Sequence, residues 1–163
     1  MYMINDNHSG KINYEEHLSP HFTLGEMLRS GVAITHRIKN EPKVDDSPFG
    51  YRAEEVKDNL RALCTSVLEP LRRRVGRVVV VSGYRCEALN RLVSGADNSQ
   101  HMKGEAVDIH VTGQKMCRRY GAILSTTDFD QIIFEPQESA VKRWIHVSHK
   151  RNGRNRHQIL GQF

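Results

Sequence analysis

The 163-residue sequence contains no uninterrupted apolar segment of about 18 residues, so it offers no candidate for a transmembrane helix. Its first residues also lack the basic segment followed by an apolar stretch that marks a secretory signal peptide. Cysteine is scarce, and the three cysteines form no C-x-x-C pair, which argues against a disulfide framework or a cysteine zinc site. Cys64 and Cys117 fall in apolar helical patterns, and we expect them to be buried free thiols.

Aromatic residues are also few, at 7% of the chain, whereas the formal net charge is +5 with histidine neutral. This charge favours an anionic partner. Basic residues cluster in Arg72–Arg74 and between Lys150 and His157, but aromatic residues are not interleaved with them. A platform on which nucleic-acid bases stack is therefore not expected, and a basic nucleic-acid-binding protein is the weaker alternative.

The length of the chain suits one domain with a single core. Residues 1–17 are polar and aperiodic and predict a flexible N-terminal arm, which leaves residues 18–163 as the domain. Residues 35–50 form a long loop rich in charge, with Pro42 and Pro48. Two interpretations of this loop stay open, a lid over a cleft and a plain connector.

Apolar residues at spacings of three and four predict a main helix from Tyr51 to about Val75, which Pro70 should kink or end. A capping box at Thr23 and Glu26 predicts the start of a short helix. Further predicted helices cover residues 87–93 and 113–124, and predicted strands cover residues 77–82, 105–111, 129–135 and 143–149. The four valines in the first of these strands indicate that it is buried, and the last two strands suit an antiparallel hairpin.

The segment from Ser99 to Asp108 reads S-x-H-x-x-G-x-A-x-D, and another histidine, His146, lies in the last predicted strand. His101, Asp108 and His146 together offer two imidazoles and one carboxylate as zinc ligands. Three protein ligands leave a tetrahedral zinc with one open position, which distinguishes a catalytic site from a closed structural one. Gly104 supplies the bend between the first histidine and the strand that carries the carboxylate.

These motifs resemble those of the zinc D-alanyl-D-alanine carboxypeptidase family of peptidoglycan metallopeptidases. Three further blocks, Phe22–Met27, Val80–Arg85 and Phe129–Glu135, are similar to blocks of its compact bacterial and phage subgroup. The resemblance covers roughly residues 18–160. It implies an α+β fold with a small, mostly antiparallel sheet and helices packed on one face. It also implies a bound Zn2+ ion and hydrolysis of peptide bonds in peptidoglycan stem peptides, the expected partner.

The resemblance implies substrate-binding roles for three residues around the metal. Arg85 would hold a carboxylate of the substrate, since a guanidinium grips a planar carboxylate through two hydrogen bonds; the alternative is an internal salt bridge. Ser99 would hydrogen-bond the substrate backbone, or would only cap its turn. Trp144 would wall the pocket beside the metal, or would pack in the core.

One position departs from the family pattern. Better-known members carry an acid three residues before the last histidine ligand, and this chain has Arg143 there. If the hairpin pairs Glu135 with Trp144, strand alternation puts Glu135 on the face of His146, and we predict Glu135 as the catalytic general base. Glu138 in the turn is a second candidate. A site without any general base would leave a non-catalytic, zinc-containing module for cell-wall binding or interaction, which is the alternative function.

Two reactions suit these observations, a D,D-carboxypeptidase and an endolysin-type endopeptidase that cuts an internal bond. We expect a monomer with no nucleic-acid and no membrane partner. Without a signal peptide, the expectation is synthesis in the cytoplasm and action on the cell wall after export or lysis.

Overall fold

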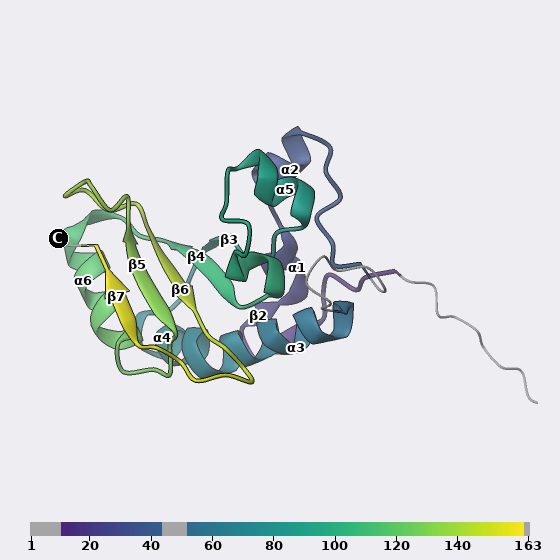
Figure 1. Ribbon diagram of the computed structural model, residues 1–163. Helices are drawn as coiled ribbons and strands as arrows, with labels where there is room; N and C mark the ends of the chain where they lie inside the picture. Colours follow the sequence, from purple (N-terminus) through teal and green to yellow (C-terminus); the bar gives the residue numbers. More distant parts are fainter. Residues whose placement is uncertain (1–10, 44–51, 162–163) are drawn as a thin grey trace, which may run out of the picture.

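A five-stranded sheet is the centre of the fold in this computed structural model, which describes residues 11–43 and 52–161 (Figure 1). Its strands, in spatial order, are β3 (Val80–Ser82), β4 (Ala106–His110), β6 (Trp144–Ser148), β5 (Gln131–Glu135) and β7 (Gln158–Leu160). Neighbouring strands are antiparallel except β5 and β7, which are parallel. The predicted α+β fold with a small, mostly antiparallel sheet is therefore confirmed.

Helices pack against one face of this sheet. Its principal helix segments are α3 (Ala53–Leu63), η1 (Cys64–Leu68), α4 (Glu69–Val75) and α6 (Gly113–Leu124). The α6 helix contacts β5, β6 and α4, and Figure 1 shows α4 and α6 on the same side of the strands. Shorter helices are α1 (Leu24–Leu28), α2 (Gly31–Thr35), α5 (Glu87–Leu92) and the 3-10 helix η2 (Gln100–Lys103).

The helical face of the sheet forms the hydrophobic core. Along β4 and β6, alternate side chains are apolar and fully buried there: Val107, Ile109, Ile145 and Val147. They join one cluster with side chains of the α3–α4 helix and α6, including Leu60, Leu63, Leu71 and Leu124. The free thiols of Cys64 and Cys117 are also buried in this core, as predicted. The alternation leaves the other face of β4 and β6, the front face, for polar side chains.

Pro70 does not end the main helix. Of the two predicted effects of this proline, a kink or an end, the end is therefore wrong. The chain stays helical from Ala53 to Val75 through a π-helical turn, η1, placed directly before the proline. In this turn the Glu69 N–H donates to the carbonyl of Cys64, five residues back. A wider turn of this kind accommodates a residue that lacks an N–H donor without stopping the helix.

The prediction that residues 77–82 form a buried strand is also wrong. Only residues 80–82 are in β3. Val79, directly before the strand, is 44% exposed, and Val81, within it, is 48% exposed. The reason is position, because β3 is the edge of the sheet and pairs only with β4. Val78 alone of the four valines is buried.

A small N-terminal hairpin, β1 (His17–Ser19) and β2 (Phe22–Thr23), is attached to the main helix by Glu69. The Glu69 carboxylate is buried, and it accepts hydrogen bonds from the Ser19 hydroxyl at 2.7 Å and the His21 N–H at 2.8 Å. Burial favours the protonated form of Glu69, but the hydrogen bonds from Ser19 and His21 outweigh it and lower the pKa. The charged carboxylate therefore stabilises the folded state.

Glu69→Gln is expected to lower the free energy of unfolding by about 1–3 kcal/mol at neutral pH, since it removes charge-assisted hydrogen bonds in a buried position. Because the folded-state pKa of Glu69 lies below its unfolded value of about 4.3, this stabilisation is complete above that pH and is lost as the pH falls through the lower pKa. Urea denaturation at several pH values should show the gap between parent and variant closing in acid. The exposed Glu54 is the control, and a gap that persists unchanged at low pH would contradict the assignment.

The predicted flexible arm lies outside the described residues as far as residue 10. From Ile12 onward the chain lies against the domain: Glu16 forms ion pairs with Lys57 and Arg61 at 3.1 and 3.2 Å, and Ile12 packs on the core. Residues 44–51 of the loop interpreted as a lid or connector also lie outside the described residues. Among the helices that the structure describes, none is long and apolar enough to span a membrane.

Candidate metal centre

The front face of the sheet carries two of the three predicted ligands side by side. Asp108 on β4 and His146 on β6 are directly opposite each other in the antiparallel register. Residues opposite each other have their side chains about 4.5–5.5 Å apart at Cβ. The strand pairing thus brings a carboxylate and an imidazole from sequence-distant segments to one place.

His101 reaches the same place from η2, which precedes β4. The Ser99 hydroxyl caps this short helix by accepting a hydrogen bond from the His101 N–H, at 3.2 Å. Gly104 ends the helix with a left-handed φ of 75°, and a Cβ at this position would lie only 2.5 Å from the Val56 carbonyl oxygen. The bend that the sequence assigned to Gly104 is therefore confirmed, and only glycine meets both requirements.

The three ligand atoms converge. His101 Nε2 lies 3.3 Å from Asp108 Oδ1 and 3.2 Å from His146 Nδ1, and His146 Nδ1 lies 3.0 Å from Asp108 Oδ1. Ligand atoms bound tetrahedrally to a zinc ion at about 2.0–2.1 Å are about 3.3 Å apart, so the observed spacing fits such an ion. Within the described ranges, these three residues are the group of histidine, cysteine and acidic side chains whose atoms could hold a metal.

The surroundings favour the deprotonated imidazole that a metal requires. His101 Nδ1 lies 2.7 Å from the Gly83 carbonyl oxygen, to which it donates, so its Nε2 presents a lone pair to the cluster. Burial lowers the pKa of His101, although the Asp108 carboxylate opposes this shift. A neutral His101 is therefore the form favoured at neutral pH.

Asp108 is ionised. Its burial favours the protonated form, but the His101 and His146 imidazoles beside it outweigh that penalty and lower the pKa of Asp108 well below its usual range. Its second oxygen, Oδ2, accepts a hydrogen bond from Arg85 Nη2 at 3.2 Å. The centre therefore combines one carboxylate and two imidazoles, a set that zinc and other divalent transition metals accept.

Arg85 lies beside Asp108 as an internal ion pair, and its Nε also donates to the Ser82 hydroxyl at 3.2 Å. This is the internal salt bridge that the sequence left open as an alternative. A guanidinium has five N–H donors, and these two bonds engage Nε and one Nη2 proton. Arg85 thus fixes the orientation of Asp108, while binding of a substrate carboxylate by Arg85 stays a prediction.

Glu135 and Trp144 share the front face with His146. The pairing of Glu135 with Trp144 occurs as predicted, and Ile133 is opposite His146. Glu135 is consequently the diagonal neighbour of His146, a relation of about 7–8 Å that long side chains can bridge. Trp144 is half-buried, with His110 opposite it on β4 and Glu135 opposite it on β5.

Arg143, which occupies the position of the acid in better-known relatives, is exposed. Its N–H donates to the Glu135 carbonyl and its carbonyl accepts from the Val111 N–H, so it continues the ladder of β6. Strand alternation then assigns Arg143 to the face of Ile145, opposite to His146. Glu135 therefore lies on the face of the sheet that carries the metal ligands, and Arg143 lies on the opposite face.

Sequence reasoning missed an ion pair between a buried acid, Asp130, and an exposed arginine, Arg156. Asp130 has no exposed surface and binds the Arg156 guanidinium at 2.8 Å and the Gln100 amide at 3.1 Å. Burial would raise the pKa of Asp130, but the hydrogen bonds from Arg156 lower it to about 2. Arg156, which the sequence placed in a basic tail, therefore ties the end of the chain to the residue before His101.

An α+β fold with two imidazoles and a carboxylate converging on one sheet face is typical of metal-dependent hydrolases. Residues 20–148 match the family model described as peptidase M15, which is most of the chain. The chain belongs to the peptidase M15 family, in agreement with the resemblance seen in its motifs. A search among curated proteins found no match.

Proposed function

We propose that this peptidase binds a zinc ion through His101, Asp108 and His146 and hydrolyses peptide bonds in the stem peptides of peptidoglycan. The observation that carries the proposal is the spacing of 3.0–3.3 Å among three ligand atoms at the front face of the sheet. Its peptidase family supports the reaction class. The cell wall is then its place of action.

His101, Asp108 and His146 would hold a divalent ion, which would supply a Lewis acid for the amide carbonyl and for activation of a water. The residues of the chain transfer the proton and orient the metal ligands. Glu135, on the front face, accepts the proton of the attacking water and delivers it to the leaving amine. Arg85 keeps Asp108 oriented through their ion pair, and the Trp144 side chain lines the front face beside Glu135.

Two reactions suit the site. A D,D-carboxypeptidase must hold the terminal carboxylate of its substrate, and Arg85 would bind it through the guanidinium N–H groups that Ser82 and Asp108 do not engage. An endopeptidase that cuts an internal bond has no such requirement. The products of the reaction therefore decide between the two.

Two measurements test the proposed function. Metal analysis of purified protein should find about one zinc per chain, because the described residues form one three-ligand group. Mass spectrometry of peptidoglycan fragments incubated with the zinc-loaded protein should show new peptide termini, and loss of a terminal D-alanine alone would identify a carboxypeptidase. Zinc binding without any cleavage would support the non-catalytic module, and absence of metal would contradict both.

A further inference from the structure

The loop of residues 83–86, between β3 and α5, supports two of the three proposed metal ligands. Its Gly83 carbonyl accepts the hydrogen bond of His101 Nδ1 at 2.7 Å, and its Arg85 side chain pairs with Asp108 at 3.2 Å. The Arg85 N–H also donates to the His101 carbonyl at 3.1 Å. The positions of His101 and Asp108 therefore depend on where this loop lies.

The Asn40 side chain, outside the metal centre, makes three hydrogen bonds around that loop, beside the backbone hydrogen bond from the Tyr84 N–H to the Met27 carbonyl at 2.7 Å. Asn40 lies 44 residues before Tyr84, and its Nδ2 donates to the Tyr84 carbonyl at 2.8 Å. Its Oδ1 accepts from the Cys86 N–H, also at 2.8 Å. The second Nδ2 proton is directed to the Leu28 carbonyl at 2.9 Å, at the end of α1. Asn40 thus joins two backbone groups on either side of Arg85 to the helix α1.

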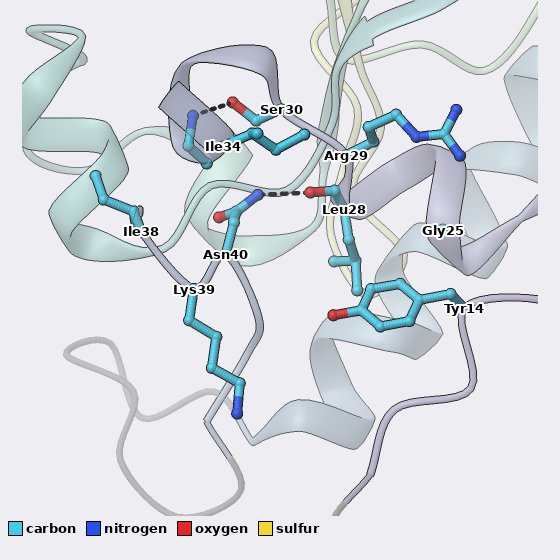
Figure 2. Close-up of a pocket in the computed structure, with 10 residues that line it drawn as sticks. Tyr14, Gly25, Leu28, Arg29, Ser30, Ile34, Ile38, Lys39 and Asn40 are labelled. Atoms are coloured by element: carbon cyan, nitrogen blue, oxygen red, sulfur yellow. Dashed lines mark hydrogen bonds between the residues drawn. The ribbon is translucent and has the colours of Figure 1, made fainter. Parts of the chain in front are cut away.

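Asn40 is buried, and its three hydrogen bonds require a side chain with two donors and one acceptor. The residue is 8% exposed and lies at the floor of a hollow of about 300 Å³ between α1, α2 and the segment from Ile38 to Asn40. Figure 2 shows its amide facing the Leu28 carbonyl, with Ile34, Ile38 and Tyr14 around the hollow. Only a primary amide of this length offers two donors and an acceptor together, so aspartate and serine each lose part of the set.

From these contacts we infer that Asn40 is a positioning residue of the metal centre. It fixes the backbone at Tyr84 and Cys86, and this fixes the Gly83 carbonyl and the Arg85 guanidinium that orient His101 and Asp108. The inference rests on the proposed function, because it assigns to Asn40 an effect on metal binding. Removal of hydrogen-bond partners behind metal ligands typically costs about 10–100-fold in metal affinity.

The test compares zinc affinity with folding stability in four proteins: the parent, Asn40→Asp, Asn40→Ser and Leu124→Ala. Zinc dissociation constants are measured by competition with a chromophoric chelator at a temperature where every apoprotein is folded, and Tm is measured without metal. Asn40→Asp is expected to raise the zinc dissociation constant by about 10-fold or more and to shift the visible bands of the cobalt-loaded protein. Leu124→Ala, fully buried on α6 behind the sheet, is expected to lower Tm and leave zinc affinity and the cobalt bands unchanged.

Asn40→Ser serves where Asn40→Asp does not fold, since it removes the reach of the side chain without adding a charge. Dissociation constants of the Asn40 variants within about two-fold of the parent, with normal cobalt bands, would overturn the inference and leave the proposed function intact. A parent protein that binds neither zinc nor cobalt would overturn the proposed function, and the inference with it.

Discussion

His146→Ala is expected to abolish peptide hydrolysis and to weaken zinc binding by on the order of 100-fold, while the apoprotein stays folded. Four-ligand zinc sites contribute roughly 10–16 kcal/mol of binding free energy, so one ligand corresponds to about 3 kcal/mol. The imidazole lies on the front face, and His146 is not a member of the hydrophobic cluster on the other face of the sheet. Its removal therefore leaves that core packed, and the loss is confined to the metal centre.

The measurement is the zinc dissociation constant, combined with thermal unfolding at increasing zinc concentration. A ligand that binds only the folded state raises Tm, so zinc should stabilise the parent strongly and His146→Ala weakly. His110→Ala is the matched control, because His110 lies on the same face two residues after Asp108 but is exposed and contacts Thr112. Equal zinc stabilisation of His146→Ala and the parent would show that the ion, if bound, is elsewhere.

The metal centre could be predicted from sequence because it depends on the two most regular features of a sheet. Alternation along residues 105–111 puts Asp108 on the face opposite to the apolar core, and the motif around His101 requires only a local turn. The pairing of Glu135 with Trp144 was predictable because a hairpin makes the two strands neighbours. Each of these inferences needs contacts within one strand, one turn or one hairpin, whereas the meeting of Asp108 with His146, 38 residues apart, was implied by the family resemblance and not by the pattern.

The supports of the centre could not be predicted in the same way. Asn40 contacts backbone groups 44 and 46 residues away, and its own segment has no periodic pattern that reports a partner. For Arg85 the sequence left two partners open, and only the fold shows that the carboxylate beside it belongs to Asp108. Hydrogen bonds of single polar side chains to distant loops depend on the tertiary arrangement, which residue types alone do not encode.

The errors in secondary structure have a similar origin. Four valines indicate a strand but not its place in the sheet, and an edge position leaves Val79 and Val81 exposed. Pro70 breaks an ideal α-helix, yet packing against the sheet keeps the chain helical through a π turn. The short strand β7 follows a polar segment and pairs in parallel with β5, where Asp130 and Arg156 hold the two together.

Glu135→Gln is expected to lower kcat by about 10²- to 10⁴-fold and to leave zinc affinity unchanged, since a glutamine cannot accept a proton from water. The substitution keeps size and polarity at a half-buried position opposite Trp144, so folding should be unaffected. Steady-state kinetics on a synthetic stem peptide, with zinc content measured on the same samples, separates loss of chemistry from loss of metal. A fall in kcat with constant KM identifies a group that acts in the transition state.

Glu138→Gln is the matched control, because Glu138 lies in the turn after β5 and is exposed. If Glu135 is the general base, Glu138→Gln keeps kcat within about two-fold of the parent, and the large loss of kcat occurs only in Glu135→Gln. The reverse pattern would move the role to the turn. Full activity in both variants would mean that the water is deprotonated without a carboxylate from this hairpin, and Arg143 at the family's acid position would then mark a different route for the proton.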